Sequence, residues 1–186
     1  MNRFIALILL LIVLPFLVIV VCFIIIFEQE SAFFIQERIG KNKIPFKLIK
    51  IRTMQNNQIT FIGSILRKTG IDEIPQLINI LKGEMNFIGP RPLTKNDIER
   101  LGWQTEYYQK RWNVKPGLTG LAQLSPICHK KMSFFFDLYY TKNRRIGLDL
   151  GILLMSFLVL FVGKQKVKKI ILKRHNRKYR LKKNNL

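Results

Sequence analysis

The sequence predicts a membrane-associated α+β protein that is mostly helical and contains one short β-hairpin. Three observations lead to this fold class. A long stretch near the N-terminus, from Phe4 to Phe27, has no charged residue. Two strand-like stretches joined by a short turn follow it, and the remaining chain alternates short apolar stretches of helical length with loops rich in Gly and Pro. We therefore expect one membrane-bound domain.

Composition narrows the possible functions. The 186 residues leave room for one catalytic domain, and the net charge of +21 favours anionic partners: nucleic acid, anionic lipid or phosphorylated small molecules. The only cysteines are Cys22 and Cys128, which argues against a disulfide framework and fits a reducing compartment. His129 and His175 have no zinc-ligand spacing. We expect three parts: a membrane helix at 1–30, a catalytic domain with interfacial helices at 31–163, and a basic tail at 164–186.

The N-terminal stretch is long enough to cross a bilayer. Its 24 residues would extend about 36 Å as a helix, against a hydrocarbon core of about 30 Å. Pro15, after Leu14, must kink or break that helix. A kinked span is favoured by the cost of freeing backbone groups in lipid, and a re-entrant helix that returns to the face it entered is the alternative. The Lys- and Arg-rich remainder belongs in the cytoplasm in either case.

Ala32–Gln36 and Phe46–Arg52 flank the turn Gly40–Lys43 and predict the β-hairpin. The apolar pattern changes phase after Leu48, which indicates either a bulge or a strand that is buried on both faces. Lys50 and Arg52 share one strand face. They can point at one phosphate, or they can form an ordinary solvated face.

Asp72 and Glu73 are the candidate catalytic residues. A helix or turn beginning at Ile62 leads to Arg67, and Thr69 is expected to cap a second helix that contains both carboxylates and ends at Gly83. Acids in a first helical turn are ordinarily capping residues. However, the chain has only 11 Asp and Glu against 32 Lys and Arg, so an adjacent pair between cations favours phosphate chemistry.

The following loop, Gly89-Pro90-Arg91-Pro92, holds Arg91 between two prolines and suits a phosphate ligand. A second loop, Lys115–Gly120, offers Lys115 and Thr119 as donors to an anion. A helix is expected at Asn96–Lys110, between these two loops.

Three aromatic residues near the end of that helix suit the core or a membrane interface: Tyr107, Tyr108 and Trp112. Phe134–Tyr140 predicts an aromatic helix. Leu150–Val162, with 13 apolar residues, is too short to span a bilayer and suits a buried or interfacial helix. The tail from Lys164 carries many cations and no acid, and the membrane segment upstream favours lipid over nucleic acid as its partner.

Several motifs in this order resemble the small monotopic phosphoglycosyl transferases of the bacterial sugar transferase family. The similarity runs from about Phe4 to Asp149. The similar blocks are the proline-broken N-terminal helix, Phe34–Gly40, Lys50–Met54, Leu66-Arg67 with Asp72-Glu73, Leu81–Pro92, Val114–Gln123, and Asp137–Tyr140 followed by Asp149. The chain differs from the common pattern in having Leu14 before the proline, Lys115 in the Pro-Gly loop and Leu121 after its second glycine.

The resemblance implies an enzyme at the cytoplasmic face of the bacterial inner membrane. Such an enzyme moves a phosphosugar from a UDP-sugar to polyprenyl (undecaprenyl) phosphate and releases UMP, by a ping-pong route through a covalent aspartyl intermediate. Asp72 matches the nucleophile and Mg²⁺ ligand, and Glu73 matches its dyad partner. The residues matching the substrate and phosphate-binding positions are Lys50, Arg52, Arg67, Gly89, Pro90, Arg91, Lys115, Thr119 and Gln123. The resemblance also implies a re-entrant helix broken at Leu14-Pro15.

The expected partners are the UDP-sugar, polyprenyl phosphate and the anionic phospholipid membrane. Nucleic acid is not expected as a partner, and a second copy of the chain, in a homodimer, is kept as an option. Two other functions remain as alternatives: a non-enzymatic, membrane-anchored polybasic protein that binds anionic lipid or nucleic acid through its tail, and a phosphohydrolase that uses the same two carboxylates.

Overall fold

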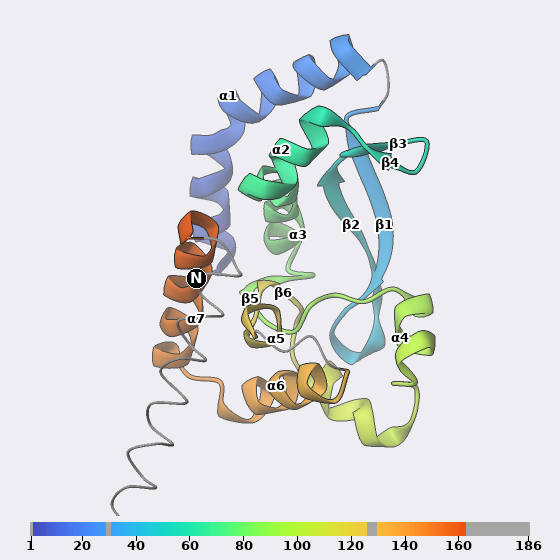
Figure 1. Cartoon of the computed structure of the whole chain (residues 1–186). Helices are drawn as coiled ribbons and strands as arrows, with labels where there is room; N and C mark the ends of the chain where they lie inside the picture. Colours follow the sequence, from blue (N-terminus) through green and yellow to red (C-terminus); the bar gives the residue numbers. More distant parts are fainter. Residues whose placement is uncertain (1, 29–30, 126–129, 163–186) are drawn as a thin grey trace, which may run out of the picture.

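The computed structural model describes residues 2–28, 31–125 and 130–162 (Figure 1). The expected fold class is confirmed in its coarse form, because the chain is mostly helical with short sheets and one long apolar N-terminal helix. The basic tail, Cys128, His129 and His175 lie outside the described residues.

Helix α1 (Asn2–Glu28) runs without a break through Pro15 and bends about midway, as Figure 1 shows. It packs along α3 (Gln76–Lys82). A narrow side of α1 is buried at Ala6, Leu17 and Ile24. Among the described helices it alone has the length and composition to cross a membrane.

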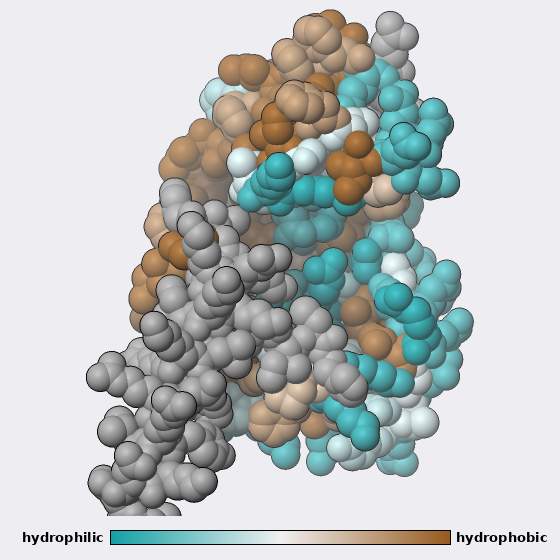
Figure 2. Space-filling model, in the orientation of Figure 1, coloured by the Kyte–Doolittle hydropathy of each residue, from teal (hydrophilic) through white to brown (hydrophobic). Residues whose placement is uncertain are grey.

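Most of α1 exposes large apolar side chains rather than burying them. Phe4 is 68% exposed, and such exposure continues along the helix to Phe27. Apolar side chains are also exposed on α7 (Ile146–Val162) and on α2 (Phe61–Thr69), where Phe61 is 83% exposed. Figure 2 shows the corresponding hydrophobic colour along the α1 side of the molecule. Exposed apolar surface of this extent is typical of an interface with a membrane or another protein.

Strands β1 (Phe33–Ile39) and β2 (Pro45–Ile51) form the expected antiparallel hairpin, joined through the short 3₁₀ turn η1 (Lys41–Lys43). The pairing runs one to one from Phe33↔Ile51 to Ile39↔Pro45, so it contains no bulge. The phase change after Leu48 instead reflects a strand end that is covered on both faces. A second, very short hairpin joins β3 (Met54–Gln55) and β4 (Gln58–Ile59).

Helix α2 is the helix expected before Arg67, but it extends to Thr69 and is ended by Gly70 in the left-handed conformation, φ 73°. The prediction that Thr69 caps the next helix was therefore wrong. The Thr69 hydroxyl donates back to the carbonyl oxygens of Ile65 and Leu66. Asp72 and Glu73 lie in a separate 3₁₀ turn, η2 (Ile71–Glu73), and α3 begins only after Pro75. Gly83 ends α3 as expected, with φ 81°.

The predicted loop Lys115–Gly120 is in part a strand. Its central residues form β6 (Gly117–Thr119), which pairs in parallel with β5 (Asn86–Ile88). This pairing joins segments about thirty residues apart, and sequence periodicity in such short strands cannot reveal it. The β5–β6 pair holds the two predicted phosphate loops side by side.

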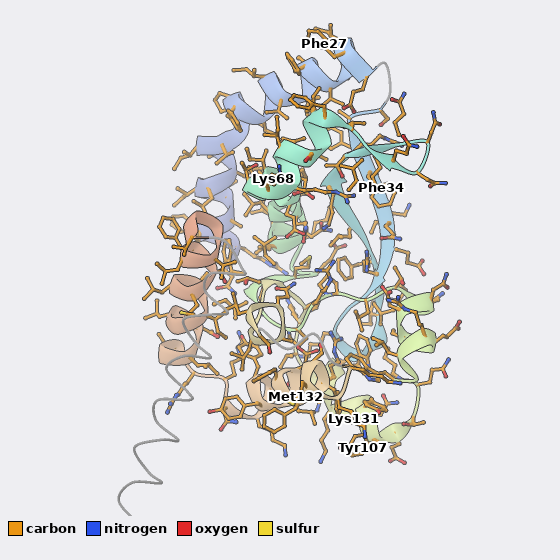
Figure 3. All side chains as sticks on the ribbon, viewed as in Figure 1. Phe27, Phe34, Lys68, Tyr107, Lys131 and Met132 are labelled. Atoms are coloured by element: carbon orange, nitrogen blue, oxygen red, sulfur yellow. The ribbon has the colours of Figure 1, made fainter. Side chains whose placement is uncertain are left out.

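The prediction of a single helix at Asn96–Lys110 was also wrong. Helix α4 (Lys95–Leu101) ends at Gly102 in the left-handed conformation, φ 63°, and a 3₁₀ helix, η3 (Glu106–Asn113), follows. Helices α5 (Leu121–Leu124) and α6 (Lys130–Asn143) precede α7, and α6 contains the expected aromatic helix. Trp112 is in the core, whereas Tyr107 is 72% exposed. Tyr107 and Phe27 mark opposite ends of the molecule (Figure 3).

Candidate active site

The two candidate carboxylates lie beside β2. The left-handed Gly70 turns the chain after α2, so that the short η2 turn presents Asp72 and Glu73 next to the end of the strand. Lys50 Nζ on β2 donates to Glu73 Oε1 at 2.6 Å. The predicted strand cation and the predicted dyad are therefore in direct contact.

Asp72 is nearly buried, with 9% of its surface exposed. Burial raises the pKa of its carboxyl above the ordinary value, and the adjacent charge of Glu73 raises it further, while Lys50 and Arg67 act in the opposite direction. The Asp72 carboxylate thus lies within reach of two cations and beside a second negative charge. Additional positive charge close to this carboxyl would favour its ionised form and lower its pKa.

Arg67 and Arg52 each donate a hydrogen bond to a neutral oxygen. Arg67, in the last turn of α2, donates from Nε to Thr53 Oγ1 at 2.8 Å. Arg52 donates from Nε to the carbonyl oxygen of Ser31 at 2.8 Å, just before β1. Arg67 acts on the charge of Asp72, whereas Arg52 is not among the residues that line the cleft described next.

A cleft lies between the β2–η2–α3 side of the site and the two predicted phosphate loops. Its lining residues come from six segments of the chain. They are Arg38, Leu48, Lys50, Glu73, Gln76, Arg91, Pro92, Gly117, Leu118 and Gln123. Among the predicted site residues, Lys50, Glu73, Arg91 and Gln123 therefore share one cavity. Lys115 and Thr119 do not line it, and the Thr119 hydroxyl is instead paired with Ser156 Oγ on α7 at 2.6 Å.

Two lining residues with polar side chains, Arg38 and Gln76, were not singled out as site residues from the sequence. Arg38 lies near the end of β1, within a block that resembles the family pattern, so that block was an available signal. Gln76 follows Pro75 at the start of α3 and resembles any polar residue of a first helical turn. Only the tertiary structure places it in the cleft.

The loop that carries Arg91 is fixed by its backbone carbonyl groups. Pro90 O accepts from Gly117 N at 3.0 Å, and Pro92 O accepts from Arg38 Nη1 at 3.2 Å. Arg91 O accepts from Arg111 Nη2 at 2.6 Å. Consecutive carbonyls are thus held from three different elements, which orients the Arg91 side chain toward the cleft.

Arg111 is a buried anchor for this loop. It is 3% exposed, its Nε donates to Asp137 Oδ2 at 2.7 Å, and its guanidinium lies 5.4 Å from the ring centre of Trp103 and 4.8 Å from that of Trp112. The ion pair and the aromatic rings compensate the buried charge. Arg111 thereby links the aromatic core around α6 to the backbone of Arg91.

The cations of the cleft differ in how they are paired. Lys50 is bound to Glu73, and Arg38 is bound to Asp97 at 3.2 Å. Within the part of the chain that the structure describes, the Arg91 side chain has no hydrogen bond or ion pair with protein. Burial lowers the pKa of Arg38, Asp97 opposes this effect, and the charge of Arg91 lowers the pKa further. An anion between Arg38 and Arg91 would relieve that repulsion.

The described residues contain no cluster of three or more His, Cys, Asp or Glu side chains that could hold a metal ion alone. A Mg²⁺ ion commonly takes only one or two protein carboxylates and completes its shell with water and substrate phosphates. Asp72, buried between Glu73 and two cations, fits that kind of partial ligand set.

Comparison with known proteins gives a consistent result. The family described as bacterial sugar transferase matches residues 1–163. An uncharacterized sugar transferase, EpsL of Bacillus subtilis, is 38% identical over 142 residues, which are 68% of this chain and 68% of that protein.

Two further relatives carry named activities. A UDP-N-acetylgalactosamine-undecaprenyl-phosphate N-acetylgalactosaminephosphotransferase of Aeromonas hydrophila is 31% identical over 149 residues, which cover 70% of this chain and 35% of that protein. A UDP-glucose:undecaprenyl-phosphate glucose-1-phosphate transferase of Caulobacter vibrioides is 37% identical over 107 residues, which cover 50% of this chain and 40% of that protein. The matched region is thus about a third to two fifths of the length of these two relatives.

Proposed function

The chain belongs to the bacterial sugar transferase family, of the phosphoglycosyl transferase type, and on that premise we propose that it transfers a phosphosugar from a UDP-sugar to undecaprenyl phosphate with release of UMP. This transfer would be the first membrane step of a bacterial glycan pathway, at the cytoplasmic face of the inner membrane. The named activities of the Aeromonas and Caulobacter relatives support the donor and acceptor classes.

The observation that carries the proposal is a nearly buried Asp72 whose neighbour Glu73 lines a cationic cleft, although Asp72 itself is not among the lining residues. Asp72 adjoins Glu73, and the cleft beside them contains Arg38, Lys50 and Arg91. Arg91 is exposed, its backbone is fixed by Arg111, and its side chain has no protein partner among the described residues. This combination suits a nucleophilic carboxylate next to a diphosphate.

We propose a ping-pong mechanism. A carboxylate oxygen of Asp72 attacks the phosphorus that bears the sugar, and the bond from that phosphorus to the bridging oxygen breaks with its electron pair leaving on UMP. A phosphate oxygen of undecaprenyl phosphate then attacks the same phosphorus, and the bond to Asp72 breaks, which restores the carboxylate. One small site can in this way serve a soluble donor and a lipid acceptor in turn.

The attacking carboxylate and the diphosphate carry the same sign of charge, so the step needs positive charge in place. Arg91 and Arg38 supply it from one side of the cleft and Lys50 from the other, while Arg67 acts on Asp72. We propose that Asp72 also holds Mg²⁺ together with donor phosphate oxygens; the bound ion would neutralise charge on those oxygens. Glu73 orients Lys50 through their 2.6 Å contact.

We further propose that α1 is re-entrant, so that both of its ends lie on the cytoplasmic side. Asn2 Nδ2 donates to Asn86 Oδ1 at 3.1 Å, and Arg3 Nη2 donates to Lys82 O at 3.3 Å. At the other end, Gln55 Nε2 donates to Glu28 O at 3.5 Å. A helix with its ends on opposite sides of a bilayer could not make all three contacts with one domain, and the bend midway along α1, which contains Pro15, provides the return.

The decisive test is Asp72→Asn in full-length protein in detergent, with Mg²⁺, undecaprenyl phosphate and a panel of UDP-sugars. UMP release should fall at least about a thousandfold, because the amide is a far poorer nucleophile and metal ligand. Intact-mass analysis of the wild type with donor alone should show one phosphosugar adduct, absent from the variant. Glu99→Gln, which removes an exposed carboxylate on α4, should keep wild-type turnover.

Near-normal turnover of Asp72→Asn would contradict the covalent mechanism while leaving the reaction class intact. Wild-type protein that releases no UMP with any donor would contradict the transferase itself and favour a lipid-binding role. Release of free phosphosugar in place of a lipid-linked product would indicate a hydrolase.

A further inference from the structure

Gln76 is a buried polar residue without a protein partner. It is 2% exposed and lies at the start of α3, where it lines the cleft with Glu73 and Lys50. Throughout 2–28, 31–125 and 130–162, no residue makes a hydrogen bond with its side-chain amide. An amide has two donor hydrogens and a carbonyl acceptor, and the amide atoms of Gln76 are not among the fully buried atoms that lack a partner, so their small remaining exposure is to the cleft that Gln76 lines.

Asn79, one turn later on the same helix, shows the opposite pattern. It is 0% exposed, and its Oδ1 accepts from Ile49 N at 3.2 Å. Its Nδ2 donates to Lys47 O and to Glu84 Oε2, each at 2.7 Å. Asn79 therefore ties α3 to β2, which is the usual reason for a buried amide. Gln76 carries the same amide group and is nearly as buried, but its side chain connects no two elements.

A buried amide that makes no hydrogen bond within the protein contributes little to stability, and an apolar side chain of the same shape would pack as well. Gln76 is thus poorly explained by folding. Its position in the cleft offers another explanation, which is that its partner is a bound ligand. Gln123 lines the same cleft from α5, so a second amide faces the same space.

We propose that the Gln76 amide hydrogen-bonds the sugar of the UDP-sugar donor and contributes to sugar selectivity. This inference rests on the proposed transferase function. Phosphate oxygens are anionic, and Arg38, Lys50 and Arg91 already face the cleft for them. Sugar hydroxyls both donate and accept hydrogen bonds, as a neutral amide does, so the chemistry of Gln76 matches the uncharged part of the donor.

The position along the chain favours the sugar over the uracil ring. Gln76 follows Asp72 by four residues on the segment that carries both the proposed nucleophile and the cleft residue Glu73. The phosphorus attacked by Asp72 bears the sugar directly, whereas uracil is separated from it by a second phosphate and a ribose. Gln76 shares the cleft with Glu73, the neighbour of the nucleophile, so we expect it to meet the sugar before the uracil.

The test is Gln76→Met, which keeps the length of the side chain and removes its polar groups. Full-length wild type and variant in detergent should be compared for thermal unfolding, for UMP affinity by calorimetry, and for kcat/KM with UDP-glucose, UDP-galactose and their N-acetylhexosamine counterparts. The Tm should stay equal or rise. UMP affinity should change by less than about twofold, while kcat/KM for the preferred donor should fall at least about tenfold and the ratio between donors should narrow.

Asn79→Leu serves as the matched control, because it removes an amide of the same helix that is fully used by the protein; it should lower the Tm. A Gln76→Met variant with a lowered Tm would mean that Gln76 is structural and would overturn the inference. Unchanged donor ratios, or a parallel loss of UMP affinity, would also overturn the assignment to the sugar. If the wild type turns over no donor, the proposed function fails and this inference fails with it; if only the Gln76→Met results differ from expectation, the transferase stands.

Discussion

Single residues in this site act mainly through the way their charges are paired. Lys50 is bound to Glu73 and Arg111 to Asp137, so these charges hold elements in place. Arg91 has its backbone fixed and its side chain left for a ligand within the described residues. Binding an anion at Arg91 therefore needs no protein ion pair to break, which lowers the cost of forming the donor complex.

Asp97 connects helix capping to the cleft. It accepts from Thr94 N in the capping box of α4 and receives Arg38 Nη1 at 3.2 Å and Arg100 Nη2 at 3.0 Å. Burial alone would raise the pKa of this carboxyl, but the hydrogen bonds from Thr94 and the charges of Arg38 and Arg100 hold it below the ordinary value. The ionised form is thus favoured in the folded state.

We expect Asp97→Asn to lower stability at neutral pH by about 1 kcal/mol, because the amide keeps the cap but loses both ion pairs. A carboxyl with a lowered folded pKa contributes its stability above the unfolded value of about 3.9 and loses it as the pH falls through the folded value. The Tm difference from wild type should therefore shrink between pH 5 and pH 3. Glu37→Gln, at an exposed pair with Lys95, should show little difference at any pH; a Tm deficit of Asp97→Asn that is constant with pH would contradict this account.

At the scale of elements, the site depends on close contact between backbones. A Cβ atom on Gly117 would lie 2.5 Å from the carbonyl carbon of Ile88, and one on Gly89 would lie 2.5 Å from the carbonyl oxygen of Lys115. Real Cβ atoms do not approach backbone atoms this closely. The parallel β5–β6 pair therefore requires glycine, which has no Cβ atom, at both positions. The position of the Pro90–Arg91 loop depends on the same two glycines.

Gly117→Ala should therefore separate β5 from β6 and displace the loop, since Gly117 N also donates to Pro90 O. We expect a loss of about 1–3 kcal/mol of stability together with a raised KM for the donor. Gly151→Ala on α7 is the control, because a Cβ there meets nothing within 4 Å. It should leave turnover and the Tm near wild type or slightly raise the Tm. A Gly117→Ala protein with normal Tm and KM would show that the β5–β6 contact is dispensable.

The elements also show where sequence reasoning succeeds and where it ends. The β-hairpin, the helix before Arg67 and the stop at Gly83 follow from local pattern and local conformational preference, and all are present. Thr69 was assigned to the wrong helix because Gly70 ends the first one, and a Thr hydroxyl can bond backward as readily as it can cap forward. The shared cleft of Lys50, Glu73, Arg91 and Gln123 was expected in part, whereas Gln76 could not be found because its burial depends on distant segments.

At the scale of the whole molecule, α1 relates the membrane to the site. Its buried side joins two parts of the core: Ala6 packs with Leu48 and Ile80, and Ile24 packs with Ile51 and Leu66. Leu48 and Ile80 belong to the strand and helix that flank the cleft. The apolar exposed side of α1 would enter lipid while its buried side supports β2 and α3. If α1 enters the membrane as proposed, one helix would set both the depth in the membrane and the position of the dyad.

This arrangement predicts that both ends of α1 face the cytoplasm. In a background where Cys22 and Cys128 are Ser, single variants Asn2→Cys and Glu28→Cys should react with a membrane-impermeable maleimide in inverted inner-membrane vesicles and remain unlabelled in intact spheroplasts. A spanning helix would place the two ends on opposite sides, so labelling of Asn2→Cys in spheroplasts would contradict re-entry. The same experiment with Pro15→Ala added tests whether the proline causes the re-entry. Without the proline, a continuous apolar helix is free to straighten and cross the bilayer, so Asn2→Cys should then be labelled in intact spheroplasts.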